Sequence, residues 1–205
     1  MALAGITTIL AITACQNARV FAATDQYTVQ PGDSLWKISL KYQVGWPDIY
    51  NANKQQIPNP HLIYPGQVLT IPLTDPTALS YERQVVNLCN QYRQQNGLSA
   101  LTMNWQLERM ARIKSQDMRD NHYFSHTSPT YGSPFNMMKS FGITFSAAGE
   151  NIAVGQPNPQ SVVQSWMNSP GHRANILNAN FTQIGVGYAV GGKYGAYWTE
   201  DFIGR

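Results

Sequence analysis

Hydrophobic and polar positions divide the chain into two parts. In the first part, Tyr27–Val29 alternates as a short strand, and Val68–Ile71 forms a second strand that a proline closes. Between them, Ser34 is suited to cap one helix and Pro47 to the first turn of another. The pattern therefore predicts a small β-α-α-β module within residues 26–72.

Longer helical stripes follow a predicted linker at residues 73–78. The stripe of the first helix, which ends near Asn96-Gly97, consists of Tyr81, Val85, Leu88, Cys89 and Tyr92. The stripe of the second consists of Leu107, Met110, Ala111 and Met118. Shorter helices are expected at 133–141 and 159–168, and strands at 183–190 and 196–202, with Ile184, Val186, Tyr188 and Val190 on one face of the first strand. Helices interleaved with late strands predict an α+β or α/β sandwich at residues 79–205.

Composition excludes several classes of protein. Hydrophobic residues make up 43% of the 205 positions and charged residues 12%, which indicates packed domains rather than disorder. The formal net charge is +3, with no run of Lys or Arg, so a nucleic-acid partner is not expected. A mildly basic protein is weakly attracted to anionic wall polymers.

Residues 1–23 are predicted to be an export signal. Residues 2–14 form an uncharged apolar run, too short for a transmembrane helix and of the length of a signal-peptide core. Two processing sites are possible. Cys15 ends a segment that resembles a lipobox and would be lipidated, whereas Val20-Phe21-Ala22 suits cleavage by an ordinary signal peptidase. Lipidation is slightly favoured. The protein is thus expected outside the cytoplasm, in the envelope or cell wall, with a membrane contact only through that lipid.

The segments 27–38 and 59–72 resemble the opening and closing segments of a lysin motif (LysM). The resemblance implies a peptidoglycan partner or a related N-acetylglucosamine polymer, bound in a shallow groove between two loops. The residues carried over to this groove are Gly32, Asp33, Ser34, Leu35, Asn59, Pro60, Leu62 and Ile63. Leu35 and Ile63 are equally compatible with the core, and Asp33 and Ser34 with capping a helix.

Three further segments carry polar chemistry. They are Tyr123–Pro129 with His126, Ala148–Ala153 with Glu150, and Ser169–Leu177 with His172, each interpreted as a loop or helix end. In this order they resemble the CAP superfamily (SCP domain), most closely its bacterial branch. The resemblance implies an α-β-α sandwich with a cavity of two His and two acidic residues. His126 and Glu150 match its motifs directly, His172 fits the bacterial branch, and Glu200 is a weak candidate for the second acid.

This set of residues supports two chemistries. His126 and His172, with Glu150 nearby, are a credible set of ligands for a divalent metal such as zinc. Alternatively, His and Glu act as general base and acid, which would make a wall-localised, metal-assisted hydrolase. Cys89 lies on an apolar helix stripe and is interpreted as core, so no nucleophile accompanies the histidines. A binding protein is therefore favoured over an enzyme, and a purely structural polar network remains a third alternative.

Overall fold

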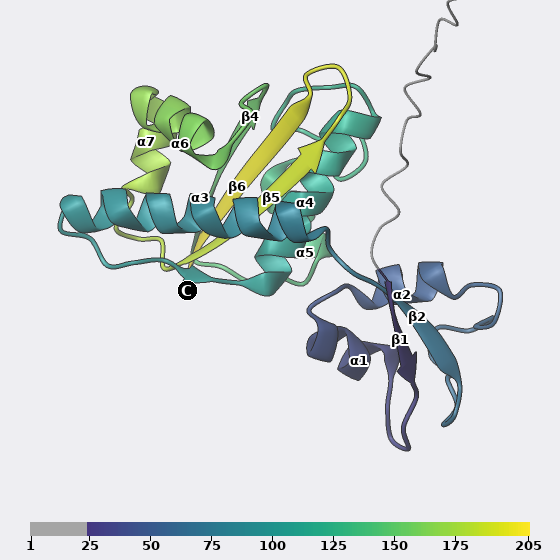
Figure 1. The fold of residues 1–205 in the computed structure, drawn as a ribbon. Helices are drawn as coiled ribbons and strands as arrows, with labels where there is room; N and C mark the ends of the chain where they lie inside the picture. The colour runs from purple at the N-terminus through teal and green to yellow at the C-terminus, as the bar shows by residue number, and fades with distance from the viewer. Residues whose placement is uncertain (1–23) are drawn as a thin grey trace, which may run out of the picture.

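The computed structural model describes residues 24–205 (Figure 1). The predicted export signal, with Cys15 and Val20-Phe21-Ala22, lies outside the described residues. Within residues 24–205, no helix combines the length and the hydropathy that crossing a bilayer requires.

The N-terminal module has the predicted β-α-α-β order. Its elements are β1 (Thr24–Thr28), α1 (Leu35–Tyr42), α2 (Trp46–Ala52) and β2 (Val68–Pro72). The two strands pair antiparallel, with Thr24 opposite Pro72 and Thr28 opposite Val68. Side chains from both helices and both loops then bury a small apolar core, which consists of Val29, Leu35, Ile38, Val44, Ile49, Ile57, Leu69 and Ile71. Burial of these side chains stabilises the module, since it has no disulfide within the described residues.

The connection to the second domain is shorter than the predicted linker at 73–78. Helix α3 (Pro76–Gln95) already begins at Pro76, and the Asp75 side chain caps it by accepting a hydrogen bond from the Ala78 backbone N–H. Proline is favoured in the first turn of a helix because its fixed φ suits the helix and its missing N–H is not needed there. Only Leu73–Asp75 therefore connect β2 to α3.

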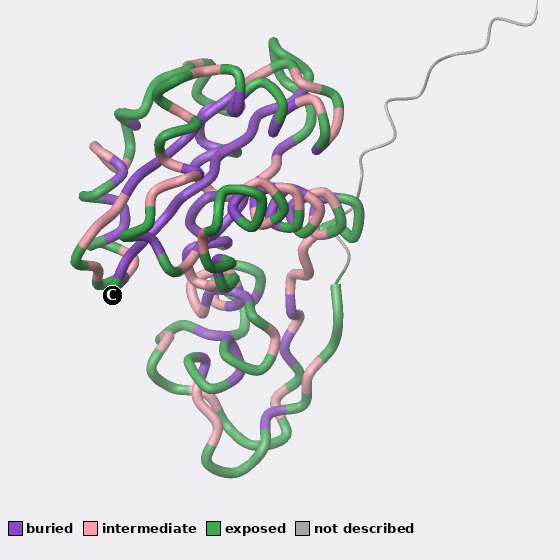
Figure 2. Tube along the Cα trace, turned by 90° about the vertical axis from the view of Figure 1, so that its left-hand side faces the viewer, coloured by how far each residue is buried: buried purple, intermediate pink, exposed green. Residues whose placement is uncertain are grey.

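The second domain is a three-layered α-β-α sandwich, as predicted. After α3 come β3 (Thr102–Met103), α4 (Trp105–Asp120), α5 (Pro134–Ser140), β4 (Ala147–Val154), α6 (Pro159–Asn168), α7 (Pro170–Ile176), β5 (Gln183–Val190) and β6 (Ala196–Gly204). The sheet order is β3-β5-β6-β4, so β4 lies at an edge. Helices α4 and α5 cover one face of the sheet, and α3, α6 and α7 cover the other (Figure 1). The strands form the buried centre of the domain (Figure 2).

Two glycines let α4 lie directly on β5. A Cβ at Gly185 would overlap the backbone of Leu107 and Glu108, and one at Gly187 would overlap that of Ala111 and Arg112. Neither glycine has a left-handed φ, so close approach of helix and strand, not a turn, is what requires them.

The structure adds three elements that the sequence patterns did not predict. These are β3, β4 and α7. Strand β4 was not predicted because it is buried on both faces and its apolar and polar residues do not alternate. Val190, predicted on the same face as Ile184, Val186 and Tyr188, is 61% exposed, because β5 ends there before the turn to β6.

Candidate functional site

Two separate sites can be built from the described residues. The first is a groove of about 310 Å³ in the N-terminal module. It lies between the loop that follows β1 and the loop that precedes β2, and both helices contribute a tryptophan. Its lining residues are Asp33, Ser34, Leu35, Trp36, Trp46, Pro60, His61 and Ile63.

Five of the eight predicted glycan-binding residues line this groove: Asp33, Ser34, Leu35, Pro60 and Ile63. Gly32, Asn59 and Leu62 belong to the same two loops but are not among the lining residues. Gly32 has a φ of +83°, so it supplies the turn between β1 and α1. The Asn59 side chain accepts a hydrogen bond from the His61 backbone N–H at 3.0 Å and so fixes the second loop.

Several of the lining residues also hold the groove in shape. The Asp33 carboxylate accepts hydrogen bonds from the Gln30 N–H at 2.8 Å and the Tyr27 hydroxyl at 2.7 Å, and these bonds hold the pKa of Asp33 below its usual value. Ser34 caps α1 by accepting from the Lys37 N–H at 3.2 Å. Leu35 is 3% exposed and belongs mainly to the core. Trp36, Trp46 and His61 are lining residues that were not among the predicted glycan-binding residues, and Trp46 lies outside both motif segments.

The second site lies at the edge of the sandwich, where His126 meets Glu150. The Nδ1 atom of His126 is 2.7 Å from Oε1 of Glu150. The His126 side chain is 53% exposed, whereas that of Glu150 is 3% exposed. The interpretation of Glu150 as a loop residue is wrong: it lies inside strand β4, because the sheet buries this segment on both faces.

A buried lysine holds the loop that carries His126. Lys114 of α4 is 1% exposed and donates hydrogen bonds to the backbone carbonyls of Ser125 at 2.8 Å and His126 at 2.7 Å. Burial lowers the pKa of Lys114, while the nearby Glu150, Asp117 and Asp201 oppose this shift. The loop backbone is thus tied to α4, and the His126 ring contacts Glu150 of β4.

His172 reaches the same edge from the opposite layer. It lies in the first turn of α7, and its backbone carbonyl accepts a hydrogen bond from the Asn151 side chain at 3.1 Å. Asn175 adds a second tie by donating to Asn151 at 2.8 Å. Burial, and then the neighbouring His126, lower the pKa of His172. Because β4 is the edge strand, the two histidines come near one another although their elements cover opposite faces.

The structure does not bring Glu200 to this site. Cross-strand partners share a face of the sheet, and Glu150 lies opposite Asp201, whereas Glu200 lies opposite Asn151. Glu200 therefore points to the α3 side, away from Glu150. Asp201 takes the place that the prediction gave to Glu200, and strand alternation alone leaves either of these adjacent acids free to face the site.

Glu150 and Asp201 place two buried carboxyl groups next to each other, which disfavours ionisation of both. Glu150 Oε2 and both carboxylate oxygens of Asp201 are buried without a hydrogen-bond partner among the described residues. Burial, and then the charge of Glu150, raise the pKa of Asp201 far above its ordinary value, although Lys114 opposes the shift. Two carboxyls so placed favour sharing a proton or facing a donor group.

Cys89 belongs to the core, as its helix stripe predicted. It is fully buried and donates from Sγ to Oε1 of Glu200 at 2.9 Å. Burial, and then Glu200, raise the pKa of its thiol well above the usual value. A buried, protonated thiol is inert, and it lies on the far side of the sheet from His126.

The described residues do not supply a full metal site. Within residues 24–205, no group of three or more His, Cys, Asp or Glu side chains is arranged to hold a metal ion. Nδ1 of His126 is already engaged by Glu150, which leaves its Nε2 and the ring of His172 as donors. Two imidazoles fall short of the three protein ligands of catalytic zinc sites, so binding by His126 and His172 stays a prediction.

Comparison with known proteins finds both domains. The LysM domain model matches residues 27–72, and the model of the cysteine-rich secretory protein family (CAP) matches residues 86–202. The uncharacterized protein YkwD of Bacillus subtilis is 58% identical over 131 residues, which cover 63% of this chain and 50% of YkwD. The probable autolysin SsaALP of Staphylococcus aureus is 40% identical over 67 residues, which cover 30% of this chain and 24% of SsaALP.

One solved structure is similar over the larger domain. A crystal structure of an extracellular protein containing an SCP domain, from Bacillus anthracis, has a TM-score of 0.58 and 34% sequence identity. The matched region covers 68% of this chain and 47% of the Bacillus anthracis chain. The present chain thus spans about half the length of this protein and of YkwD. A family model that covers residues 86–202, together with the α-β-α sandwich, decides the identity: the chain belongs to the cysteine-rich secretory protein (CAP) family and carries a LysM domain before its CAP domain.

Proposed function

We propose that the protein is a cell-envelope binding protein, in which the LysM domain holds N-acetylglucosamine chains of peptidoglycan and presents the CAP domain at the wall. The observation that carries this proposal is the groove of about 310 Å³ between the two LysM loops. A concave surface with two aromatic side chains and a few polar groups suits an uncharged amino-sugar chain. The match to a probable autolysin and the match to an extracellular SCP-domain protein support a location at or outside the cell wall.

The test compares two neighbouring residues of the second loop in the full chain. Ile63 lines the groove, whereas Leu62 is not among the lining residues and is 50% exposed. We expect Ile63→Ser to weaken binding to purified peptidoglycan about tenfold, because it removes an apolar wall that a sugar ring contacts. Leu62→Ala should leave binding unchanged in the same pull-down. Equal binding by the natural sequence and both variants would refute the proposal that this groove binds peptidoglycan.

We further propose that the CAP domain binds a ligand at His126, Glu150, His172 and Asp201. A ligand with N–H or O–H donors would satisfy the carboxylate oxygens of Glu150 and Asp201 that have no partner among the described residues. The exposed His126 ring makes this edge accessible from solvent. A hydrolase would use the His126–Glu150 pair as a general base, but Cys89 is excluded as its nucleophile by its position, which favours binding.

A divalent metal is the simplest ligand to test. Calorimetric titration of the full chain with Zn²⁺ should give binding that His126→Ala with His172→Ala removes, if the two rings share the ion. Glu150→Gln keeps the shape of the side chain and should weaken the binding, because the carboxylate orients the His126 ring. Unchanged affinity in the double variant would rule out a metal held by these histidines.

A further inference from the structure

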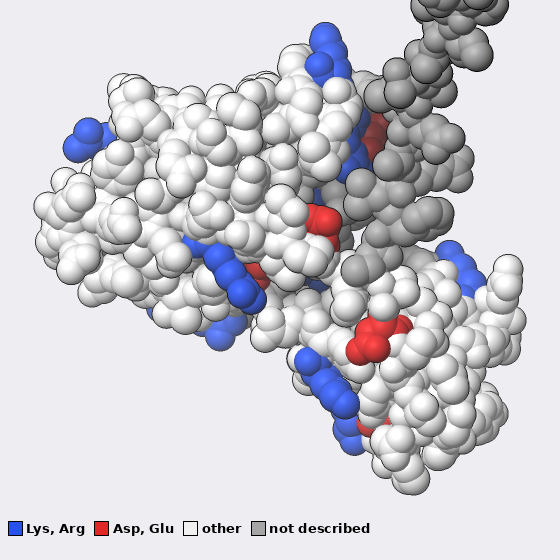
Figure 3. Space-filling model, in the orientation of Figure 1, with Lys and Arg blue, Asp and Glu red and all other residues white. Residues whose placement is uncertain are grey.

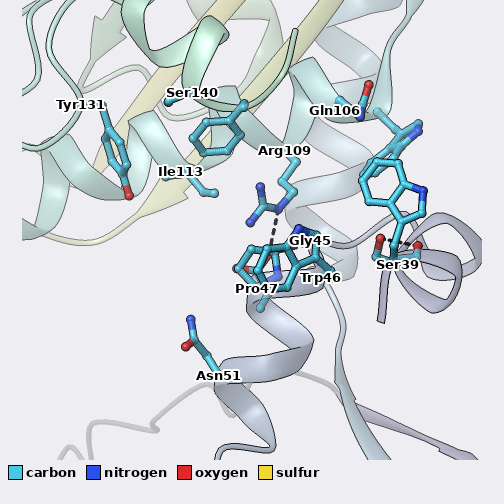
Figure 4. A pocket seen from close by; sticks show the side chains of 14 residues that line it. Ser39, Gly45, Trp46, Pro47, Asn51, Gln106, Arg109, Ile113, Tyr131 and Ser140 are labelled. Atoms are coloured by element: carbon cyan, nitrogen blue, oxygen red, sulfur yellow. Dashed lines mark hydrogen bonds and ion pairs between the residues drawn. The ribbon is translucent and has the colours of Figure 1, made fainter. Parts of the chain in front are cut away.

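A second pocket, of about 390 Å³, lies between the two domains and has most of its lining outside the two sites described above. Helices α1 and α2 of the LysM domain form one wall, and helices α4 and α5 of the CAP domain form the other (Figure 4). Its lining residues are Trp36, Ser39, Gly45, Trp46, Pro47, Asp48, Asn51, Trp105, Gln106, Arg109, Ile113, Tyr131, Ser140 and Phe141.

The pocket gathers the three tryptophans that are not fully buried. The chain has five tryptophans, of which Trp166 and Trp198 are fully buried in the CAP domain. The other three all line this one pocket: Trp36 from α1, Trp46 from α2 and Trp105 from the first turn of α4. Aromatic rings that are partly accessible in a concave surface offer stacking platforms to flat or ring-shaped ligands.

The pocket shares two lining residues with the LysM groove. Trp36 and Trp46 line both of them. Trp36 is 50% exposed, so part of its ring is accessible to a ligand. A chain-like ligand that occupied both the groove and the pocket would pass these two side chains and reach Trp105.

Arg109 joins the two walls and supplies polar donors. Its Nε donates to Asp48 at 2.8 Å, across the domain boundary, and its guanidinium lies over the Phe141 ring at 5.1 Å. Gly45 makes room for this arginine, since a Cβ at that position would overlap the guanidinium. Among the described residues, hydrogen bonds of Arg109 are made through Nε alone, so both terminal nitrogens can donate to a ligand.

Amide and phenol groups complete the polar lining. Asn51 on α2 and Tyr131 in the loop before α5 lie on the same side of Arg109, and Gln106 lies on the other side (Figure 4). No Lys and no second Arg lines the pocket, and its one acidic residue, Asp48, is paired with Arg109. Neutral donors and acceptors beside aromatic rings match the acetamide and hydroxyl groups of an N-acetylated sugar better than they match a polyanion.

We infer that this interdomain pocket is a second glycan subsite, which holds the continuation of the N-acetylglucosamine chain bound in the LysM groove. The inference rests on the proposed function of that groove and extends it to the CAP domain. One glycan chain would then contact both domains, and longer chains would bind more tightly than chains that fill the groove alone. The CAP domain would be held against the wall polymer rather than tethered beside it.

The experiment is calorimetric titration of the full chain with chito-tetraose and chito-octaose. The natural sequence should bind the octaose about tenfold more tightly than the tetraose, beyond the gain that extra binding registers give. Trp105→Ala should remove this length-dependent gain and leave the tetraose affinity unchanged, because Trp105 lines the interdomain pocket and not the groove. Tyr194→Ala removes a 40% exposed aromatic ring outside both cavities and is the matched control.

The other outcomes are equally clear. An equal ratio of octaose to tetraose affinity in the natural sequence and in Trp105→Ala would overturn the second subsite while the LysM groove stands. A loss of both affinities in Trp105→Ala, with an unchanged circular dichroism spectrum and melting temperature, would also overturn a separate subsite. Absence of tetraose binding to the natural sequence would refute the proposed groove itself and this subsite with it.

Discussion

The LysM groove and the CAP site are built in opposite ways. The groove is formed by two short loops and two adjoining helices, all within residues 33–63, around a core of eight side chains. The CAP site combines a loop after α4, a strand in the sheet and the first turn of α7, and it needs buried Lys114 and Asn151 to hold these parts. A local site depends on turns and caps, whereas a composite site depends on the packing of whole layers.

The charges of the two domains differ in the same way. Asp33 in the LysM domain is ionised and satisfied by hydrogen bonds, which lower its pKa. Glu200 and Asp201 in the CAP domain are fully buried, and burial raises both pKa values. Basic side chains are scattered over the face drawn in Figure 3 and form no continuous stripe there, so neither domain presents a polyanion-binding surface on that face.

The largest expected effect is a loss of stability in the CAP domain alone, caused by disrupted packing of α4 on β5. Gly187→Val would place a side chain into the backbone of α4, so we expect the CAP domain to lose at least about 3 kcal/mol of unfolding free energy. Binding to the LysM groove should persist. Gly171→Ala is the control, because its added methyl group meets no atom within 4 Å. Denaturant unfolding followed by the fluorescence of the buried CAP tryptophans measures the loss, and a loss below 1 kcal/mol would contradict the packing argument.

A second prediction uses pH. Burial raises the pKa of Glu200 from 4.5 to about 7, against opposing hydrogen bonds from Cys89 and Asn151. The unfolded chain releases this proton near 4.5 and the folded chain near 7, so stability falls as pH rises between these values and then levels off. The contribution is about 3 kcal/mol at most.

Glu200→Gln cannot ionise, so it should reduce the decline of CAP-domain unfolding free energy between pH 5 and pH 8, while the raised pKa values of Glu82 and Asp201 maintain a remaining slope. The slope is the relevant measurement, because the amide also changes the contact with Asn151. The lowered pKa of Asp33 acts with the opposite sign, since its stabilisation is lost only as pH falls through acidic values. The LysM domain should thus be insensitive over the same range. An unchanged slope in the variant would show that Glu200 is not the group responsible.

A smaller effect is expected from the cap of α1. Ser34→Ala removes the acceptor for the Lys37 N–H and should destabilise the LysM domain by about 1 kcal/mol. Thermal unfolding of the full chain should show a lower transition for this domain and an unchanged one for the CAP domain. If Ser34 only caps the helix, glycan affinity measured below the transition stays the same. A large loss of affinity there would instead make its hydroxyl a sugar contact.

The smallest expected effect tests whether His126 and His172 lie close enough for one charge to influence the pKa of the other. His126 lowers the pKa of His172, although burial is the larger cause. His126→Gln removes the neighbouring charge and should raise the pKa of His172, in an NMR titration of the ring protons. His61→Gln, in the LysM groove, is the control and should leave the His172 titration unchanged. The same His172 titration curve in all three proteins would show that the charge of His126 does not influence His172.

Local sequence signals predicted most elements of both domains. The Ser34 cap and the alternation of the two short strands define the LysM domain, because each acts within a few residues. The stripes of α3 and α4 were equally readable, and Cys89 was placed correctly in the core by its position on one of them.

The composition of the CAP site and the existence of the interdomain pocket depend on how the layers and domains pack. The sequence motifs indicated the family, the two-domain order, and His126, Glu150 and His172 as candidates. Strand alternation leaves Glu200 and Asp201 equivalent until the register of β4 with β6 places Asp201 beside Glu150. Likewise, no periodicity relates Trp105 to Trp36, which a local pattern treats as members of unrelated helices. The physical reason is that side-chain period and capping are short-range properties, whereas register and domain contact depend on residues far apart in the chain.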